Sequence, residues 1–205
     1  MTLINSLKYS FYVIFHPFKG FWDLKHERKG TVKSAGVLLA LLIVVFTLRR
    51  QTAGFIFNYQ TIQKTNIISE VLNIIIPVFL WCMANFAITT LMDGKGTLSD
   101  IFIITLYALV PLILVQIPVW AISHMITLDE KDLIYLIDAI SILWSAFLLF
   151  IGLKSIHEFS ALKTLITVAI AIVGMVVISF FALLFFSLIQ QLYNFLLLVY
   201  MDIRM

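Results

Sequence analysis

Residues 71–92 read VLNIIIPVFLWCMANFAITTLM, an apolar run without a charged side chain. An α-helix rises about 1.5 Å per residue, so a run of this length crosses the roughly 30 Å hydrocarbon core of a lipid bilayer. The rest of the chain is similar: 62% of its 205 residues are hydrophobic, 12% are charged, and the mean hydropathy is +1.06. A water-soluble domain of this size cannot bury so many apolar side chains. The sequence therefore predicts an all-α, polytopic transmembrane helical bundle that contacts the lipid bilayer.

Four further apolar stretches bring the predicted number of membrane spans to about five. The expected spans cover residues 35–57, 71–92, 101–122, 133–153 and 162–189. The first is short unless it also includes Thr31 and Val32 or continues through Arg49 and Arg50. In the second case, the two long arginine side chains could reach the far interface. Pro111 and Pro118 predict a bend in the third span, because proline removes a helix hydrogen bond.

The segments that flank the spans are expected to lie at the membrane surface. Apolar side chains in residues 1–34 recur at helical spacing, at Leu3, Leu7, Phe11 and Ile14. This pattern favours an amphipathic helix in the interface, and Pro17 ends it because proline disfavours helix at the preceding residue. Residues 190–205 form a C-terminal tail that resembles a short amphipathic helix. The five-span bundle is therefore expected over residues 35–189.

The distribution of lysine and arginine predicts the orientation in the membrane. Six of these residues precede the first span: Lys8, Lys19, Lys25, Arg28, Lys29 and Lys33. Because basic residues concentrate on the cytoplasmic side, we expect the amino terminus in the cytoplasm and the carboxyl terminus outside. Nine basic residues are then cytoplasmic and five are external, with Arg49 and Arg50 as the main exceptions. The net charge of +3 is thereby explained and indicates no nucleic-acid partner.

The sequence lacks the patterns that indicate an enzyme or a metal centre. There is no GxSxG nucleophile motif and no glycine-rich phosphate loop. His157 and Glu158 do not continue into the HExxH zinc motif. A metal site would require His16, His26, His157 and Glu158 to gather at one cytoplasmic surface. We therefore expect no catalytic residue, no cofactor and no metal.

The candidate intramembrane polar residues are Asn73, Asn85, Gln116 and Asp138. Amide side chains in spans more often hydrogen-bond neighbouring helices than bind a substrate. Asp138 is the most informative, because ionisable groups inside spans often mark ion or proton pathways. If the fourth helix begins at Ile137, however, Asp138 is only a first-turn acid at the outer end of that helix. We favour this second interpretation, which still leaves a span of 17 residues.

Three short motifs occupy the N-terminal segment and two of the predicted cytoplasmic turns. They are HPFKGFWDL at residues 16–24, DGKG at residues 93–96 and GLKSIHE at residues 152–158. Their order and spacing resemble the Ypt-interacting-protein (Yip) domain family, in its bacterial branch. The resemblance implies a five-span bundle in the bacterial cytoplasmic membrane with a cytoplasmic amino terminus. Eukaryotic members associate with Rab-type GTPases, but their Asp-Leu-x-Gly-Pro signature is absent here, so the resemblance implies no GTPase binding.

Two functional hypotheses fit these observations. The first is a non-enzymatic membrane scaffold or accessory subunit that binds a protein partner, or a homo- or hetero-oligomeric neighbour, at its cytoplasmic face. Its candidate contact residues are His16, Pro17, Phe18, Trp22, Asp93, Lys95, His157 and Glu158. The alternative is a small transporter or channel component with a polar path near Asn85, Gln116 and Asp138. We favour the scaffold, because charged groups are scarce in the spans and no inverted repeat is visible.

Overall fold

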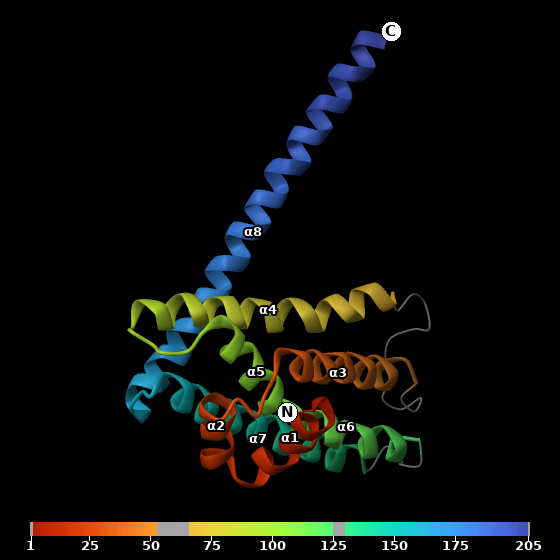
Figure 1. Ribbon diagram of the computed structural model, residues 1–205. Coiled ribbons are helices and arrows are strands. Elements are labelled where there is room, and N and C mark those ends of the chain that lie inside the picture. The colour runs from red at the N-terminus through yellow and green to blue at the C-terminus, as the bar shows by residue number, and fades with distance from the viewer. Residues whose placement is uncertain (1, 53–65, 125–129, 205) are drawn as a thin grey trace.

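The computed structural model describes residues 2–52, 66–124 and 130–204, and these residues form helices without any strand (Figure 1). Five helical stretches are long and apolar enough to cross a membrane by length and composition: Val32–Gln51, Ile67–Leu91, Leu98–Ile122, Lys131–His157 and Ala161–Asp202. The predicted all-α polytopic bundle is confirmed. The end of the predicted first span, residues 53–57, lies outside the described residues.

In chain order, the helices are α1 Leu3–Phe15, α2 Pro17–His26, α3 Val32–Thr52, α4 Ile67–Leu91, α5 Leu98–Ala108, α6 Val110–Ile122, α7 Lys131–His157 and α8 Ala161–Arg204. Helices α5 and α6 together make the third apolar stretch, and they meet at Leu109, two residues before Pro111. Proline lacks an amide hydrogen, and its ring clashes with the carbonyl one turn earlier. The predicted bend is therefore observed as an interruption of the helix.

Helix α5 is the central helix of the bundle. It contacts α3, α4 and α7, and also both N-terminal helices. Tyr107 on α5 is fully buried; its hydroxyl lies 3.0 Å from the Ser6 carbonyl oxygen and 2.9 Å from Ser34 Oγ. One phenol group thus joins α1, α3 and α5, and it satisfies polar groups that would otherwise be costly in an apolar interior.

The N-terminal helices pack into the bundle. The predicted first helix is present and ends at Phe15, two residues before Pro17. On its predicted apolar face, Leu3 is 40% and Phe11 52% exposed. Ser6 and Ser10 are buried instead. Small polar side chains let membrane helices approach closely, while larger apolar ones face lipid. Helix α2, which the sequence did not predict, follows immediately.

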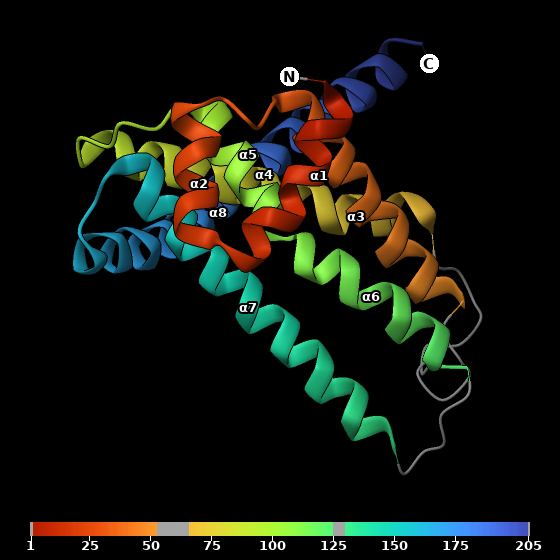
Figure 2. The ribbon, with the colours of Figure 1, turned by 60° about the horizontal axis from the view of Figure 1, so that its bottom comes forward.

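The described turns place distant motifs at one end of the bundle. Successive long helices run in alternating directions, so the α4–α5 turn and the α7–α8 link lie at the same end as α2 (Figures 1 and 2). The α4–α5 turn is followed by the start of α5, where Thr97 and Asp100 hydrogen-bond each other's backbone as a capping box. Helices α6 and α7 run side by side toward the opposite end (Figure 2).

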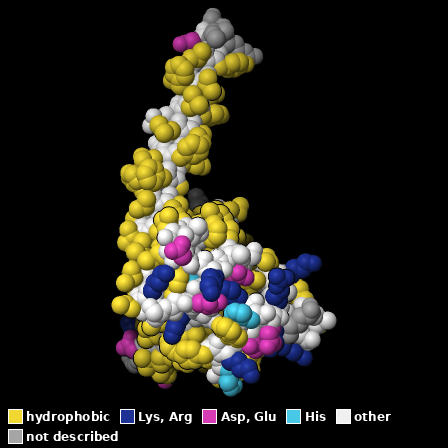
Figure 3. All heavy atoms as spheres, turned by 60° about the vertical axis from the view of Figure 1, so that its left-hand side comes forward, with side chains coloured by type: hydrophobic (Ala, Val, Ile, Leu, Met, Phe, Trp, Pro, Cys, Tyr) yellow, Lys and Arg dark blue, Asp and Glu magenta, His cyan; other side chains and the backbone are white. Residues whose placement is uncertain are grey.

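Helix α8 leaves the bundle. It packs mainly against α4 near its start, where Thr164, Thr167 and Ala171 are buried. It then continues without interruption to Arg204, so the predicted boundary between a fifth span ending at residue 189 and a separate terminal helix is not observed. Every side chain of residues 180–202 is exposed, and Figures 1 and 3 show this part projecting away from the other helices.

Candidate functional site

The candidate contact residues lie at the end of the bundle formed by α2, the α4–α5 turn and the end of α7. Phe18 and Trp22 are four residues apart on α2, so they share one face of that helix, and they are 65% and 50% exposed. They border a groove of about 330 Å³, whose other lining residues are Ile151, Lys154, Ser155, Glu158 and Phe159. The groove therefore has apolar walls with charged groups of both signs.

The DGKG turn is fitted against the ring of His157. A Cβ atom added to Gly94 would lie 2.4 Å from His157 Nδ1, and one added to Gly96 would lie 2.7 Å from His157 Cε1. The Gly96 amide donates a hydrogen bond to the same Nδ1 at 3.2 Å. His157 is only 2% exposed. The His157 ring therefore packs directly against the turn, and the two glycines allow the ring to approach the backbone closely because they have no side chain.

Glu158 joins three segments at this end. It caps α7 in the left-handed conformation, with φ of 55°, and accepts a hydrogen bond from Lys95 Nζ at 2.5 Å. His26 Nε2 of α2 lies 3.9 Å from Glu158 Oε1, and Lys25 donates to the Ile156 carbonyl. The hydrogen bond from Lys95 lowers the pKa of Glu158. The carboxylate is thus charged at neutral pH and lies at the edge of the groove.

The remaining contact candidates do not converge on the groove. His16 is exposed and stacks on Tyr12 with ring centroids 4.7 Å apart, and Pro17 starts α2. Asp93 is exposed in the α4–α5 turn, with φ of 58°. Within the part of the chain that the structure describes, no three His, Cys, Asp or Glu side chains are placed to hold a metal ion. His16 thus lies apart from His26, which approaches Glu158 to 3.9 Å.

Asp23 is a site residue that the sequence analysis did not single out. It is 4% exposed and accepts hydrogen bonds from Tyr9 Oη and Lys29 Nζ, both at 2.8 Å. Burial acts to raise the pKa of Asp23, but the hydrogen bonds from Lys29 and Tyr9 outweigh it and lower the pKa overall. Asp23 thereby fastens α1 and the segment after α2 to the helix that carries Phe18 and Trp22. No local sequence pattern connects three positions so far apart.

We expect the stability of the N-terminal helices to depend on pH through Asp23. Because the pKa of Asp23 is lower in the folded chain than the unfolded value of about 3.9, its stabilising contribution is complete above that value and is lost as the pH falls through the folded one. Unfolding temperatures in detergent from pH 7 to pH 3 should therefore fall more steeply for the wild type than for Asp23→Asn. The exposed Asp93→Asn is the control, and parallel curves for all three proteins would contradict the prediction.

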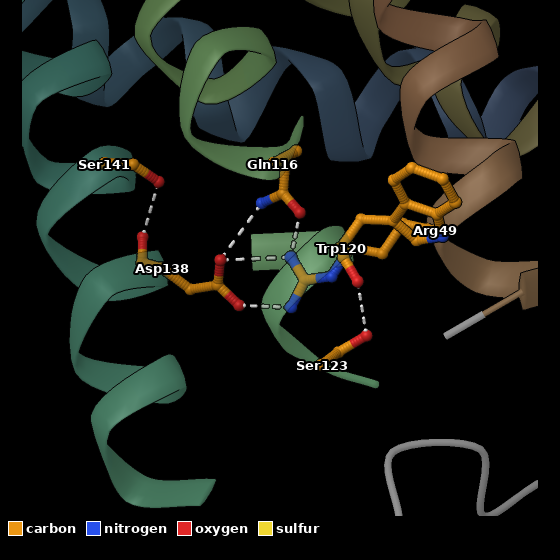
Figure 4. Close-up of polar contacts among 6 residues, drawn as sticks. All are labelled: Arg49, Gln116, Trp120, Ser123, Asp138 and Ser141. Atoms are coloured by element: carbon orange, nitrogen blue, oxygen red, sulfur yellow. Dashed lines mark hydrogen bonds and ion pairs between the residues drawn. The ribbon is translucent and has the colours of Figure 1, made fainter. Parts of the chain in front are cut away.

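A second polar cluster lies among the apolar helices (Figure 4). Arg49 Nη1 and Nη2 donate to the two carboxylate oxygens of Asp138 at 3.0 and 2.6 Å, and Gln116 Nε2 donates to Asp138 Oδ1 at 3.1 Å. Arg49 also donates to Gln116 Oε1. Helix α7 begins at Lys131, two turns before Asp138, so the interpretation of Asp138 as a first-turn acid is wrong. The cluster ties α3, α6 and α7 together.

The other polar candidates lie elsewhere. Asn85 is fully buried, and its amide donates to the Trp81 carbonyl one turn earlier at 3.1 Å, whereas Asn73 is exposed. Arg50 pairs with Glu70 at 2.6 Å, which links α3 to α4. Both arginines of α3 are therefore ion-paired. The sequence predicted only that they reach the far interface and gave them no acidic partner. Paired charges are the form in which ionisable side chains are tolerated in membranes.

A comparison with known protein families finds a match over most of the chain. The sequence model of the Yip1 domain matches residues 11–184, which run from the last residues of α1 through α2–α7 to the first half of α8. No curated protein and no solved structure matches the chain. The match covers the groove, the DGKG turn and the Arg49–Asp138 cluster. This multi-pass membrane protein belongs to the Yip1 domain family.

Proposed function

We propose that this protein is a non-enzymatic scaffold or accessory subunit of the cytoplasmic membrane that binds a protein partner in the groove between α2 and α7. The observation that carries the proposal is the pair of exposed aromatic side chains, Phe18 and Trp22, beside that groove. Aromatic side chains are enriched at protein interfaces, and tryptophan is among the commonest residues that dominate binding energy.

The construction of the groove supports this role. Its α2 wall is fixed by Asp23 and by the hydrogen bond from Lys25 to Ile156, and its Glu158 edge is fixed by Lys95. A surface that is already ordered loses little conformational entropy on binding. Lys154 and Glu158 offer one charge of each sign beside the aromatic pair. A partner segment with an apolar anchor flanked by charged side chains would complement this arrangement.

The charge distribution supports a cytoplasmic location for the groove, with the amino terminus inside. The end of the bundle that carries it contains several lysines, and Figure 3 shows Lys and Arg side chains gathered on this side among acidic and histidine side chains. The lysines of this end include Lys19, Lys25, Lys29, Lys95, Lys154 and Lys163. Basic residues near span ends concentrate on the cytoplasmic side.

The proposal predicts which substitutions abolish partner binding. Affinity capture from native membranes with Phe18→Ala plus Trp22→Ala should lose proteins that co-purify with the wild type, because truncating two interface aromatics removes most of the anchoring energy. The matched control is Phe15→Ala, since Phe15 is a 76% exposed aromatic on α1 outside the groove. An unchanged set of captured proteins in the double variant, with wild-type membrane insertion, would contradict the proposal.

The transporter alternative receives less support from the arrangement of polar groups. Gln116 and Asp138 do meet, but Arg49 donates to both carboxylate oxygens of Asp138 and neutralises its charge. Asn85 makes its hydrogen bond within its own helix. A closed, charge-neutral cluster favours a connection between helices over a path for ions.

A further inference from the structure

The C-terminal half of α8 is unlike the rest of the molecule. Residues 181–202 are exposed along their whole length, although most of their side chains are apolar. The other apolar helices each have at least one face against the bundle. Figures 1 and 3 show this half extending away from the bundle with its apolar side chains uncovered. It begins near the end of the part matched by the Yip1 domain, at residue 184.

The length of α8 exceeds what a single membrane crossing needs. Its 44 residues extend about 66 Å, roughly twice the hydrocarbon thickness, and the chain has no glycine or proline after Gly174 to interrupt the helix. Helices usually tilt by about 20° and rarely by more than 40°. A straight α8 therefore cannot bury its whole apolar length in the bilayer as an ordinary single span.

A polar stripe follows one face of this half. Ser187, Gln190, Gln191 and Asn194 are spaced by three, one and three residues, which places them on one side of the helix. All four are exposed, and none hydrogen-bonds another side chain in the described ranges. The opposite face, which contains Ile189, Leu192 and Leu196, is apolar. In hydrocarbon the three amides would lack partners, and in water the apolar side chains would remain exposed.

We propose that residues 181–202 of α8 associate with the same segment of a second copy of this chain through this stripe. Each amide side chain carries both donors and an acceptor, so two identical stripes complement each other without any further chemistry. Both copies insert with the same orientation, so a two-fold axis along the membrane normal brings each stripe against its own counterpart. Glutamine and asparagine side chains are known to join membrane helices in this way. Within the bilayer the pairing would satisfy the amides and leave the opposite, apolar face against lipid.

Cysteine cross-linking of the full-length protein in liposomes tests the contact. In a Cys82→Ala background, Ser187→Cys should form an oxidised dimer with copper phenanthroline in several-fold higher yield than Ile189→Cys on the opposite face. Ser187→Cys keeps all three amides, and Cys82 is the single natural cysteine. Equal yields on both faces would overturn the proposal. So would a Ser187→Cys thiol that fails to cross-link and reacts with an impermeant maleimide as fast as a fully exposed thiol, because the stripe would then face water.

A second measurement separates this contact from the groove. Energy transfer between labelled copies, followed against the protein-to-lipid ratio, should show association weakened about tenfold or more when Gln190, Gln191 and Asn194 are all changed to leucine. The variant keeps the helix and increases its apolarity, so loss of insertion is not expected. Phe18→Ala plus Trp22→Ala should leave this association unchanged, since the two sites are far apart in the chain. Association that is unaffected by the triple change would refute the proposal, whatever the fate of partner capture.

Discussion

Asp138→Ala is expected to lower the free energy of unfolding by about 2–3 kcal/mol, because it leaves Arg49 without its carboxylate among apolar helices. The Arg49 and Asp138 side chains are 22% and 18% exposed, so partial contact with the surroundings reduces the loss from that of a fully buried pair. Unfolding in mixed micelles of increasing denaturing detergent measures the change. Asp132→Ala, in the exposed first turn of the same helix, is the control and should have little effect.

The double variant Arg49→Met plus Asp138→Leu separates an unpaired charge from a missing contact. We expect it to recover most of the stability lost in Asp138→Ala, since an apolar pair of similar volume replaces a desolvated ion pair at little cost. If both substitutions together destabilise by the sum of the two single changes, the pair is not coupled and the cluster does not clamp the helices. Partner capture by the double variant also bears on function, because a scaffold would retain it.

Phe21→Ala is expected to destabilise the protein by about 3 kcal/mol or more, as do other phenylalanine truncations in protein cores. Phe21 is completely buried, and its ring lies so close to Gly152 of α7 that an added Cβ there would be 3.1 Å from Phe21 Cε1. Phe18→Ala on the same helix removes the same atoms from a 65% exposed side chain and should be nearly neutral. Equal losses of stability in the two variants would show that α2 is not part of the core.

The difference in burial between Phe18 and Phe21 separates partner binding from folding. A deletion of residues 1–30 would remove Phe21 together with other buried side chains of α1 and α2, such as Val13 and Leu24. Loss of partner binding in such a deletion would then follow from unfolding. Point substitutions at the exposed Phe18 and Trp22 avoid this ambiguity.

Local sequence determined most of the secondary structure. Uncharged runs of about 20 residues allow few alternatives in a chain this apolar, because backbone polar groups in lipid must be satisfied within a helix. The interruption near Pro111, the end of α1 before Pro17 and the cap at Thr97 also follow from the backbone chemistry of a few neighbouring residues. Each of these features depends on interactions within about one helical turn.

Predictions that depended on neighbouring helices were less successful. In a water-soluble protein an apolar face marks the core, but in lipid both the core and the outside are apolar, so periodicity did not reveal that α1 buries Ser6 and Ser10. The length of the fourth apolar run permitted two starting points, and only the structure placed Asp138 inside α7. The partner of Asp138 lies 89 residues away, on a helix whose arginines were expected at the interface.

The sequence by itself determined that this chain is a multi-pass membrane protein with five long apolar helices, because hydropathy and backbone chemistry act over short stretches. It did not predict α2 or the unbroken length of α8. Only the tertiary structure decided which side chains those helices bring together. It paired Arg49 with Asp138, placed His157 beneath the DGKG turn and brought Phe18 and Trp22 beside Glu158. Such contacts depend on the packing of helices distant in sequence, and no pattern within one helix encodes them.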